Sequence, residues 1–148
     1  MCIIVDANVA HKLAANPCDA DAIPLRDRVE NRRLEVASGG RNAEELLATK
    51  LRRWLVEQTR SGTVRIYPPA LLKAEESRCQ QRQKCVSNDH HIIALARVSG
   101  ARVLYTVDAA LRRDFKNKDL VDNPRGRIYS SRRNASLLDQ AGLCRRIG

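Results

Sequence analysis

Short apolar runs alternate along this chain with longer amphipathic stretches. The first run, residues 3–5, is Ile-Ile-Val, three β-branched residues in a row, and predicts a buried strand over residues 2–6. Four later segments with apolar or alternating patterns also predict strands, and each is bounded by glycine, proline or serine. These segments cover residues 33–38, 64–69, 102–107 and 126–131.

The amphipathic stretches between these runs predict helices. The clearest covers residues 42–62, where Asn42 suits the N-cap position and Gly62 suits the C-terminal end. Its apolar side chains recur at helical spacing and form one stripe: Leu47, Leu51, Trp54 and Leu55. Further helices are expected over residues 8–15, 24–33, 70–84, 88–99 with Ser87 or Asn88 as the cap, 109–115 and 135–143.

Strands separated by helices predict an α/β fold. We expect a three-layer α/β/α sandwich with a mostly parallel central sheet, because parallel strands need crossover helices on both faces. The length of 148 residues suits one domain. We assign residues 1–130 to the main domain and residues 131–148 to a basic C-terminal extension of the same domain.

Acidic residues stand at the ends of two predicted strands. Asp6 closes the strand over residues 2–6, and Asp108 follows the strand over residues 102–107. In parallel α/β sheets, ligands bind outside the carboxyl ends of the strands. We therefore expect Asp6 and Asp108 to share one edge of the sheet.

Two further acids are expected at the same edge. Glu45 lies in the first turn of the helix that follows the second strand, and Asp89 lies in the first turn of the helix that precedes Asp108. Each acid also has a plainer interpretation: Asp89 as a helix cap, Glu45 as the acid of a capping arrangement, and Asp108 as a turn residue. Asp6 is the hardest to explain without a ligand, because an unpaired acid after a buried run costs free energy.

Four convergent carboxylates would repel one another unless a cation lay among them. Mg²⁺ or Mn²⁺ suits such a site, because both prefer oxygen ligands and retain coordinated water. We predict Asp6, Glu45, Asp89 and Asp108 as catalytic residues, with Asp6, Asp89 and Asp108 as metal ligands. This arrangement predicts metal-dependent hydrolysis of phosphodiester bonds.

Other polar residues near these acids leave alternatives open. Asn8 is either a turn residue or polar support for the site, and Thr106 is either an ordinary strand residue or a group that orients an acid or a water. His90 and His91 are consecutive on a helix and point about 100° apart, so their spacing does not predict a metal pair. No Ser-His-Asp or Cys-His arrangement and no phosphate-binding glycine motif is present.

The charge of the chain points to a polyanionic partner. The formal net charge is +10, from 27 Lys and Arg against 17 Asp and Glu. The excess is concentrated in the last third of the chain, and arginine, which dominates it, recognises phosphate through its planar fork. The candidate phosphate-binding residues are Arg112, Arg113, Arg125 and Arg127, and the expected partner is RNA.

The five cysteines are widely scattered and show no CxxC spacing, which argues against a zinc site. Because Asp6 interrupts the N-terminal apolar run, a signal peptide is not expected, and we predict a cytoplasmic location with free, reduced thiols. No stretch approaches the ~20 apolar residues that a membrane-spanning helix needs, so no membrane partner is expected.

Several segments, in this order, resemble the PIN domain: IIVDANV at the start, AEEL after the second strand, NDHHIIALA, and LYTVD followed by DF. The PIN family consists of metal-dependent nucleases and includes the toxins of VapBC-type toxin–antitoxin pairs. The resemblance covers residues 1–130 and implies that Asp6, Glu45, Asp89 and Asp108 form the acidic quartet of a ribonuclease, with Asp114 as a candidate fifth acid. It also implies a homodimer and an antitoxin partner.

Two other classes of protein compete with this interpretation. The first is a PIN-like module that binds nucleic acid or a partner without catalysis, which the basic C-terminal segment favours. The second is a phospho-acceptor receiver domain, which usually has a pair of acids after its first strand, where this chain has only Asp6.

Overall fold

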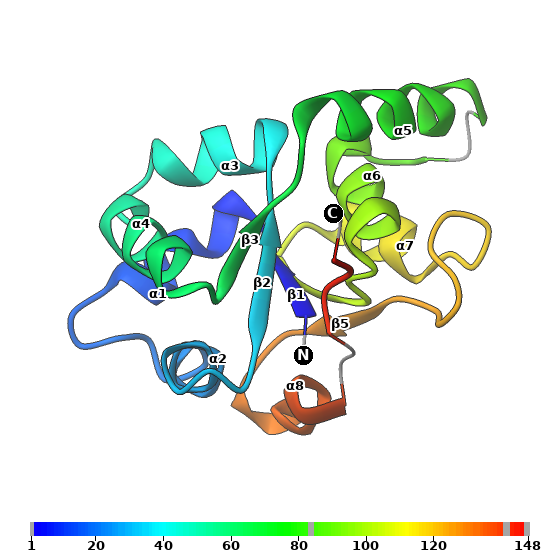
Figure 1. The fold of residues 1–148 in the computed structure, drawn as a ribbon. Helices are drawn as coiled ribbons and strands as arrows, with labels where there is room; N and C mark the ends of the chain where they lie inside the picture. The colour runs from blue at the N-terminus through cyan, green and yellow to red at the C-terminus, as the bar shows by residue number, and fades with distance from the viewer. Residues whose placement is uncertain (1, 83–84, 141–142, 147–148) are drawn as a thin grey trace.

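The structure, a computed structural model, describes residues 2–82, 85–140 and 143–146. At its centre is a five-stranded parallel sheet in the order β3-β2-β1-β4-β5 (Figure 1). The predicted α/β class and parallel sheet are confirmed, although the strands are shorter than expected. Their bounds are β1 (Cys2–Val5), β2 (Glu35–Ser38), β3 (Val64–Ile66), β4 (Val103–Tyr105) and β5 (Arg127–Tyr129).

Helices cover both faces of the sheet and give the predicted three layers (Figure 1). One face carries α1 (Ala10–Ala14), α2 (Ile23–Glu30), α3 (Gly40–Leu47), α4 (Arg52–Ser61) and α8 (Ser136–Gln140). The other face carries α5 (Pro69–Arg82), α6 (His90–Ser99) and α7 (Ala109–Lys116). The described residues also form two short 3-10 helices, η1 (Ala7–Val9) and η2 (Arg132–Asn134).

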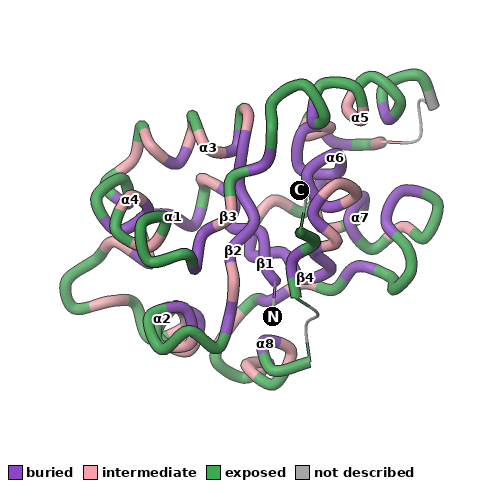
Figure 2. The backbone as a smooth tube through the Cα atoms, viewed as in Figure 1, coloured by how far each residue is buried: buried purple, intermediate pink, exposed green. Residues whose placement is uncertain are grey.

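The strands divide their side chains between two hydrophobic cores. Ile3 and Val5 of β1 face the core under α1, α2 and α4, whereas Cys2 and Ile4 face the core under α5, α6 and α7. This is the two-residue alternation of an extended strand with both faces buried. Figure 2 shows the result: the residues of β1 and β4 are buried, whereas many residues of the outer turns and helix faces are exposed.

The single helix predicted over residues 42–62 is wrong, because the structure contains two helices, α3 and α4, separated by residues 48–51. The physical cause lies at Thr49. Its hydroxyl donates to the carbonyl of Leu46 at 2.6 Å and accepts from the amide of Leu51 at 3.2 Å. A threonine side chain that bonds to its own backbone competes with the helical hydrogen bonds and favours a turn.

A disulfide joins Cys2, at the start of β1, to Cys144, near the C-terminus. The expectation that all cysteines are free, reduced thiols is therefore wrong, because two of the five form this bond. The segment around Cys144 is also tied down by hydrogen bonds. The Arg145 amide donates to Ser99 at 2.7 Å, and the Tyr67 hydroxyl donates to the Arg145 carbonyl at 2.8 Å. Sequence spacing could not show this pairing, because 142 residues separate the two cysteines.

The C-terminal residues also pack on the first face of the sheet. Leu138 of α8 is fully buried in the core that contains Ile3 and Val5. Beside it, Asp139 accepts two hydrogen bonds from the Arg28 guanidinium, at 2.8 and 3.1 Å. Within the described residues, no helix is long and apolar enough to cross a membrane.

The disulfide closes a loop that spans nearly the whole chain, so its removal should destabilise the fold. Chain entropy predicts a loss of about 5 kcal/mol for a loop of this length, or on the order of 10 °C in Tm. We expect Cys144→Ser to lower Tm by that amount in a thermal melt without reductant. Dithiothreitol should lower the Tm of the wild type similarly and leave the variant unchanged.

Cys18 provides the matched control, because it is a free, half-buried thiol outside the disulfide. Cys18→Ser should change Tm by no more than 1 to 2 °C, as expected of a substitution that leaves the covalent framework intact. Equal Tm values for Cys144→Ser and the wild type under oxidising conditions would contradict the stabilising role of the bond.

Candidate active site

Asp6 and Asp108 follow two neighbouring strands at the carboxyl edge of the sheet. Asp6 comes directly after β1, and Asp108 begins α7 shortly after β4. Val5 pairs with Tyr105, and the Asp6 amide extends this pairing by donating to the Tyr105 carbonyl at 3.0 Å. The strand pairing therefore brings both acids to one edge of the sheet.

The hydroxyl of Thr106 connects the polar groups at this edge. It donates to Asp6 Oδ2 at 2.8 Å and accepts from Asn8 Nδ2 and from the Asp108 amide, each at 3.1 Å. A hydroxyl can donate one hydrogen bond and accept two. These three contacts therefore satisfy the full hydrogen-bonding capacity of the Thr106 hydroxyl. Thr106 is completely buried, and its hydroxyl holds the Asp6 carboxyl in one orientation. Asn8 lies in the turn of η1 and contributes its side-chain amide to the same group of hydrogen bonds.

Asp6 is held in a place that opposes its ionisation. Only 7% of the residue is exposed, and this burial is the largest cause of a raised pKa. The hydrogen bond from Thr106 lowers the pKa in part, whereas the negative charges of Asp89 and Glu45 raise it further. The net direction is upward, so the fold keeps this carboxyl group despite an energetic cost.

Asp89 is the N-cap residue of α6, but its side chain makes no capping hydrogen bond. The expected cap at Ser87 or Asn88 is therefore wrong, and the plainer interpretation of Asp89 as a side-chain cap is wrong as well. Burial raises the pKa of Asp89, and the charges of Asp108 and Glu45 raise it further, while His91 lowers it. Helix capping does not use this carboxylate, which faces other acids.

Glu45 approaches the other acids from α3. Its Oε1 accepts from Arg41 at 2.9 Å, and its Oε2 lies 3.7 Å from His91 Nε2. Because α3 begins at Gly40, Glu45 lies beyond the first turn and does not serve in a capping arrangement. Its charge acts on both Asp6 and Asp89.

Two buried polar residues that the sequence analysis missed hold α3 in position. Asn42 donates to the Val5 carbonyl at 2.9 Å and accepts from the Ser38 hydroxyl at 2.7 Å. Its predicted N-cap role is wrong, because it lies inside α3 and bridges the ends of β1 and β2. Gly39 permits this tight turn, since a Cβ there would lie 2.8 Å from the Tyr67 carbonyl oxygen. The sequence signal, visible in hindsight, is a serine and an asparagine on either side of two glycines.

Asp114, the candidate fifth acid, has a different environment. It is 1% exposed, and its two oxygens accept from the Val86 amide at 2.8 Å and from the amide and hydroxyl of Ser87 at 2.9 and 2.6 Å. The Ser87 hydroxyl in turn accepts from the Asp89 amide at 3.3 Å. Asp114 therefore anchors the loop that carries Asp89, which makes it a positioning residue.

His91 is buried beside the acids, and neither of its ring nitrogens has a hydrogen-bond partner among the described residues. Burial lowers its pKa, and the nearby charges of Glu45 and Asp89 only partly oppose this. Burial therefore disfavours the charged imidazole, whose Nε2 lies 3.7 Å from Glu45 Oε2.

Asp6, Glu45, Asp89 and Asp108, here called the acidic cluster, are linked by their electrostatic effects on one another. Asp108 is held in place because its Oδ1 accepts from the Leu111 amide at 2.9 Å and caps α7. In the part of the chain that the structure describes, no three His, Cys, Asp or Glu side chains are arranged to hold a metal ion. The carboxylates are therefore neighbours without forming a closed ligand set.

Three of the four arginines proposed for phosphate contacts lie together. Arg112, Arg113 and Arg125 line one open groove beside α7. Arg127 lies apart from that groove, next to α8, where it donates to Gln140 at 3.3 Å.

Comparisons of this chain with protein-family models, with curated proteins and with solved structures find no match. The functional argument therefore rests on the residues described above.

The raised pKa of Asp6 predicts a pH-dependent cost to stability. A carboxyl group whose pKa is higher in the folded state favours folding while it is protonated, and this contribution is lost as the pH rises through the raised pKa. Asp6→Asn removes the ionisable group and keeps an acceptor for Thr106. We expect the variant to melt a few degrees above the wild type at pH 7 in EDTA, with the difference shrinking to zero as the pH falls toward 3.8, the ordinary value of the group.

Asp27→Asn is the matched control, because Asp27 is exposed on α2. Its Tm should follow that of the wild type at every pH. A Tm for Asp6→Asn at or below that of the wild type at pH 7 would show that Asp6 is not held against its charge.

Loss of the Asp114 carboxylate should loosen the loop before Asp89. Asp114→Asn removes the charge and one acceptor, and hydrogen bonds to charged groups contribute about 2 kcal/mol each. We expect faster hydrogen exchange at the amides of Val86 and Ser87 and a similar drop in the free energy of unfolding. Ser87→Ala should cost only about 1 kcal/mol, because both loop amides keep their acceptor. Unchanged exchange at Val86 in Asp114→Asn would rule out the anchoring role.

Proposed function

We propose that this protein is a PIN-type, Mg²⁺- or Mn²⁺-dependent endoribonuclease that hydrolyses phosphodiester bonds at the acidic cluster. The observation that carries the proposal is the placement of Asp6 and Asp108 at one edge of the sheet, where both are joined to the Thr106 hydroxyl. Burial and neighbouring acids also raise the pKa values of Asp6 and Asp89, and carboxylates with perturbed pKa values are enriched at functional sites. A fold gains no stability from such an arrangement, which favours a ligand that offsets it.

A divalent cation fits this set of donors. Carboxylate oxygens are hard ligands, and Mg²⁺ commonly binds through one or two of them while it keeps several waters. Asp6, Asp89 and Asp108 would hold the ion, and Glu45 would complete the acidic cluster.

The chemistry divides between the ion and the chain. Such an ion, when bound, neutralises charge on the scissile phosphate and activates the attacking water. Thr106 keeps Asp6 in one orientation, and Asp114 holds the loop that presents Asp89. The basic surface supplies attraction for the substrate backbone, which the formal charge of +10 supports.

The resemblance to PIN toxins extends the proposal to protein partners. A toxin of this kind would pair with a second copy of itself and with an antitoxin that covers the acidic cluster. RNA as the preferred substrate rests on the same resemblance and on the positive charge of the chain.

The second candidate function is a PIN-like module that binds nucleic acid or a partner without cleaving it. The observation that favours it is the lack, among the described side chains, of three His, Cys, Asp or Glu groups arranged around a metal ion. The two candidates differ in their response to metal, because only the nuclease requires the acidic cluster to bind a cation.

The nuclease proposal predicts that RNA cleavage requires both a divalent metal ion and the carboxylates of the acidic cluster. With labelled single-stranded and structured RNA, the wild type should cleave in Mn²⁺ and stop in EDTA. Asp6→Asn and Asp89→Asn should each reduce the rate by at least about 100-fold, since each removes ~3 kcal/mol or more of transition-state stabilisation. Gel electrophoresis of the products provides the measurement, and Asp27→Asn provides a control that should cleave at the wild-type rate.

Thermal melts separate the nuclease from the binding module. Mn²⁺ should raise the Tm of the wild type and have a much smaller effect on Asp6→Asn, because a ligand stabilises only the state that binds it. Equal cleavage by the wild type and both acid variants, or no shift with Mn²⁺, would contradict the proposed site.

A further inference from the structure

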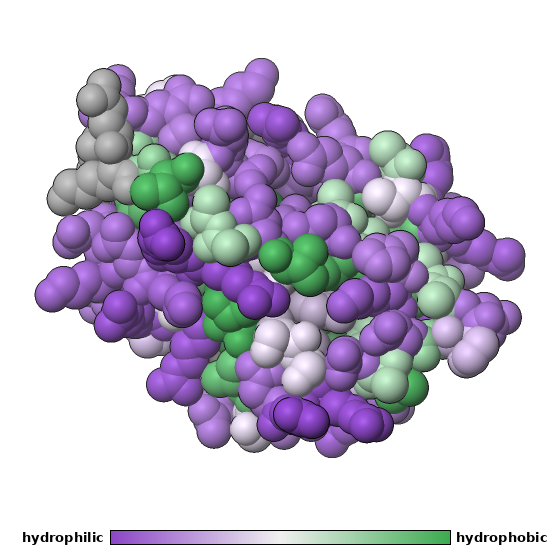
Figure 3. Space-filling view, turned by 180° about the vertical axis from the view of Figure 1, so that it is seen from behind, coloured by the Kyte–Doolittle hydropathy of each residue, from purple (hydrophilic) through white to green (hydrophobic). Residues whose placement is uncertain are grey.

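A groove of about 820 Å³ runs along α7 and the loop that follows it. Five cationic side chains line it, with Asp119 as the one acidic residue: Arg112, Arg113, Lys116, Lys118 and Arg125. We call this set the α7 groove. The face of the molecule seen in Figure 3 is mostly hydrophilic, with hydrophobic residues in separate groups.

Two of the arginines are held in place by hydrogen bonds. The guanidinium of Arg112 donates twice to the Thr106 carbonyl, at 2.9 and 2.7 Å. The guanidinium of Arg125 donates to the Lys116 carbonyl at 2.6 Å, which ties the loop to the end of α7. Side chains that are already ordered lose less entropy when a ligand binds.

The α7 groove begins next to the acidic cluster. Ala109, at its start, directly follows Asp108, and Arg112 binds the carbonyl of the residue whose hydroxyl orients Asp6. The eight residues of α7 span about 12 Å. That length accommodates only a few phosphates of one strand.

We propose that the α7 groove binds the phosphate backbone of a single-stranded nucleic acid and leads it to the acidic cluster. This inference rests on the proposed nuclease function, because a groove beside the acidic cluster guides a substrate only if the cluster cleaves it. No aromatic side chain lines the groove, so base stacking does not contribute and neither base identity nor the sugar is read there. The groove therefore binds RNA and DNA strands alike, and any preference for RNA arises at the acidic cluster.

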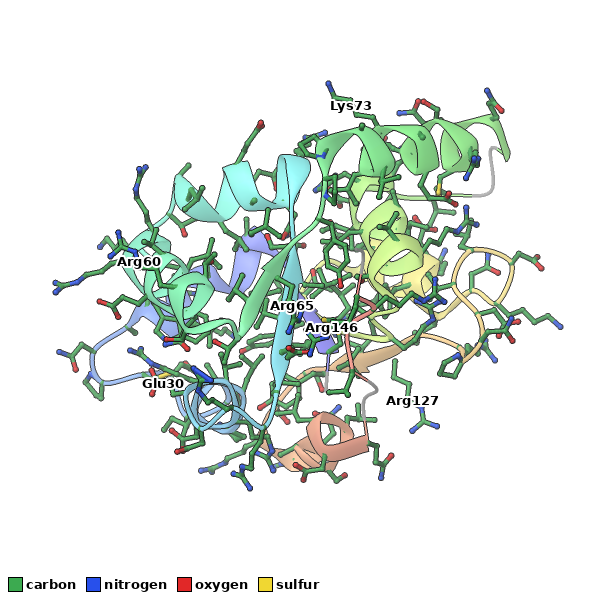
Figure 4. All side chains as sticks on the ribbon, in the orientation of Figure 1. Glu30, Arg60, Arg65, Lys73, Arg127 and Arg146 are labelled. Atoms are coloured by element: carbon green, nitrogen blue, oxygen red, sulfur yellow. A yellow bond between two sulfur atoms is a disulfide. The ribbon has the colours of Figure 1, made fainter. Side chains whose placement is uncertain are left out.

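A second basic hollow, on α4, provides the comparison. It is lined by Lys50, Arg52, Arg53 and Arg60, and one of its arginines is paired with Glu57 at 3.3 Å. Figure 4 shows Arg60 on the far side of the molecule from α7. Because α4 packs on the other face of the sheet, this hollow lies away from Asp108 and Arg112.

The test measures fluorescence anisotropy of labelled 10-nucleotide oligo-U and oligo-dT in EDTA, so that binding is separated from cleavage. The side chains of Arg113 and Lys116 are exposed, and the hydrogen bond that Lys116 accepts from Arg125 uses its backbone carbonyl, which an alanine retains. Arg113→Ala/Lys116→Ala should weaken binding of both oligonucleotides by on the order of tenfold and reduce the salt slope by about 1.4, or ~0.7 per lost phosphate contact. Arg52→Ala/Arg60→Ala on α4 should change Kd less than about twofold.

The outcomes distinguish this inference from the proposed function. If the α7 variant binds as the wild type does, or if the wild type binds neither oligonucleotide, the α7 groove is not the binding site, whatever the cleavage assay shows. If binding weakens as expected while the wild type fails to cleave in Mn²⁺, the groove stands and the nuclease proposal fails. Competition by poly-glutamate as effective as that by oligo-U would assign the groove to an acidic protein segment and overturn the inference.

Discussion

The hydroxyl of Thr106 is the contact on which the candidate site depends. It joins groups about a hundred residues apart, because one proton and two lone pairs are shared among Asp6, Asn8 and the amide of Asp108. The contact exists only because β1 and β4 pair in parallel with Val5 opposite Tyr105. A shift of that pairing by one residue would turn the Thr106 side chain to the other face of the sheet. The register of β1 and β4 thus sets the orientation of the Asp6 carboxyl group.

Around that contact, the fold places acidic side chains where their negative charges repel one another. Few of these charges are balanced by a basic side chain. Arg41 pairs with Glu45 at the surface, but Asp6 and Asp89 have raised pKa values. Two other buried polar residues have their hydrogen bonds satisfied: Asn42 bridges two strands, and Asp114 accepts three hydrogen bonds. The raised pKa values of Asp6 and Asp89 contrast with these two satisfied residues. A cation that offsets the charge, with an adjacent groove that binds phosphates, is a consistent physical account.

Much of the fold could be predicted from the sequence because its signals are local. β-branched runs and amphipathic spacing predicted the five strands, and parallel topology brought Asp6 and Asp108 to one edge. The errors have physical causes that no local pattern carries. Thr49 divides a helix through bonds to its own backbone, Asn42 is buried where its type suggests a cap, and the disulfide joins Cys2 to Cys144 across 142 residues. The role of Asp114 also escaped prediction, because its partners Val86 and Ser87 lie in a loop without periodicity.

The central claim is that the acidic cluster binds a divalent cation, and diffraction tests it most directly. Crystals soaked in Mn²⁺ should give an anomalous difference peak among the carboxylates, at about 2.0–2.2 Å from oxygens of Asp6 and Asp89, the range expected for a hard octahedral ion of this size. Crystals of Asp6→Asn treated in the same way should lack that peak. Anomalous peaks only elsewhere on the wild-type surface, with none among these carboxylates, would contradict the account.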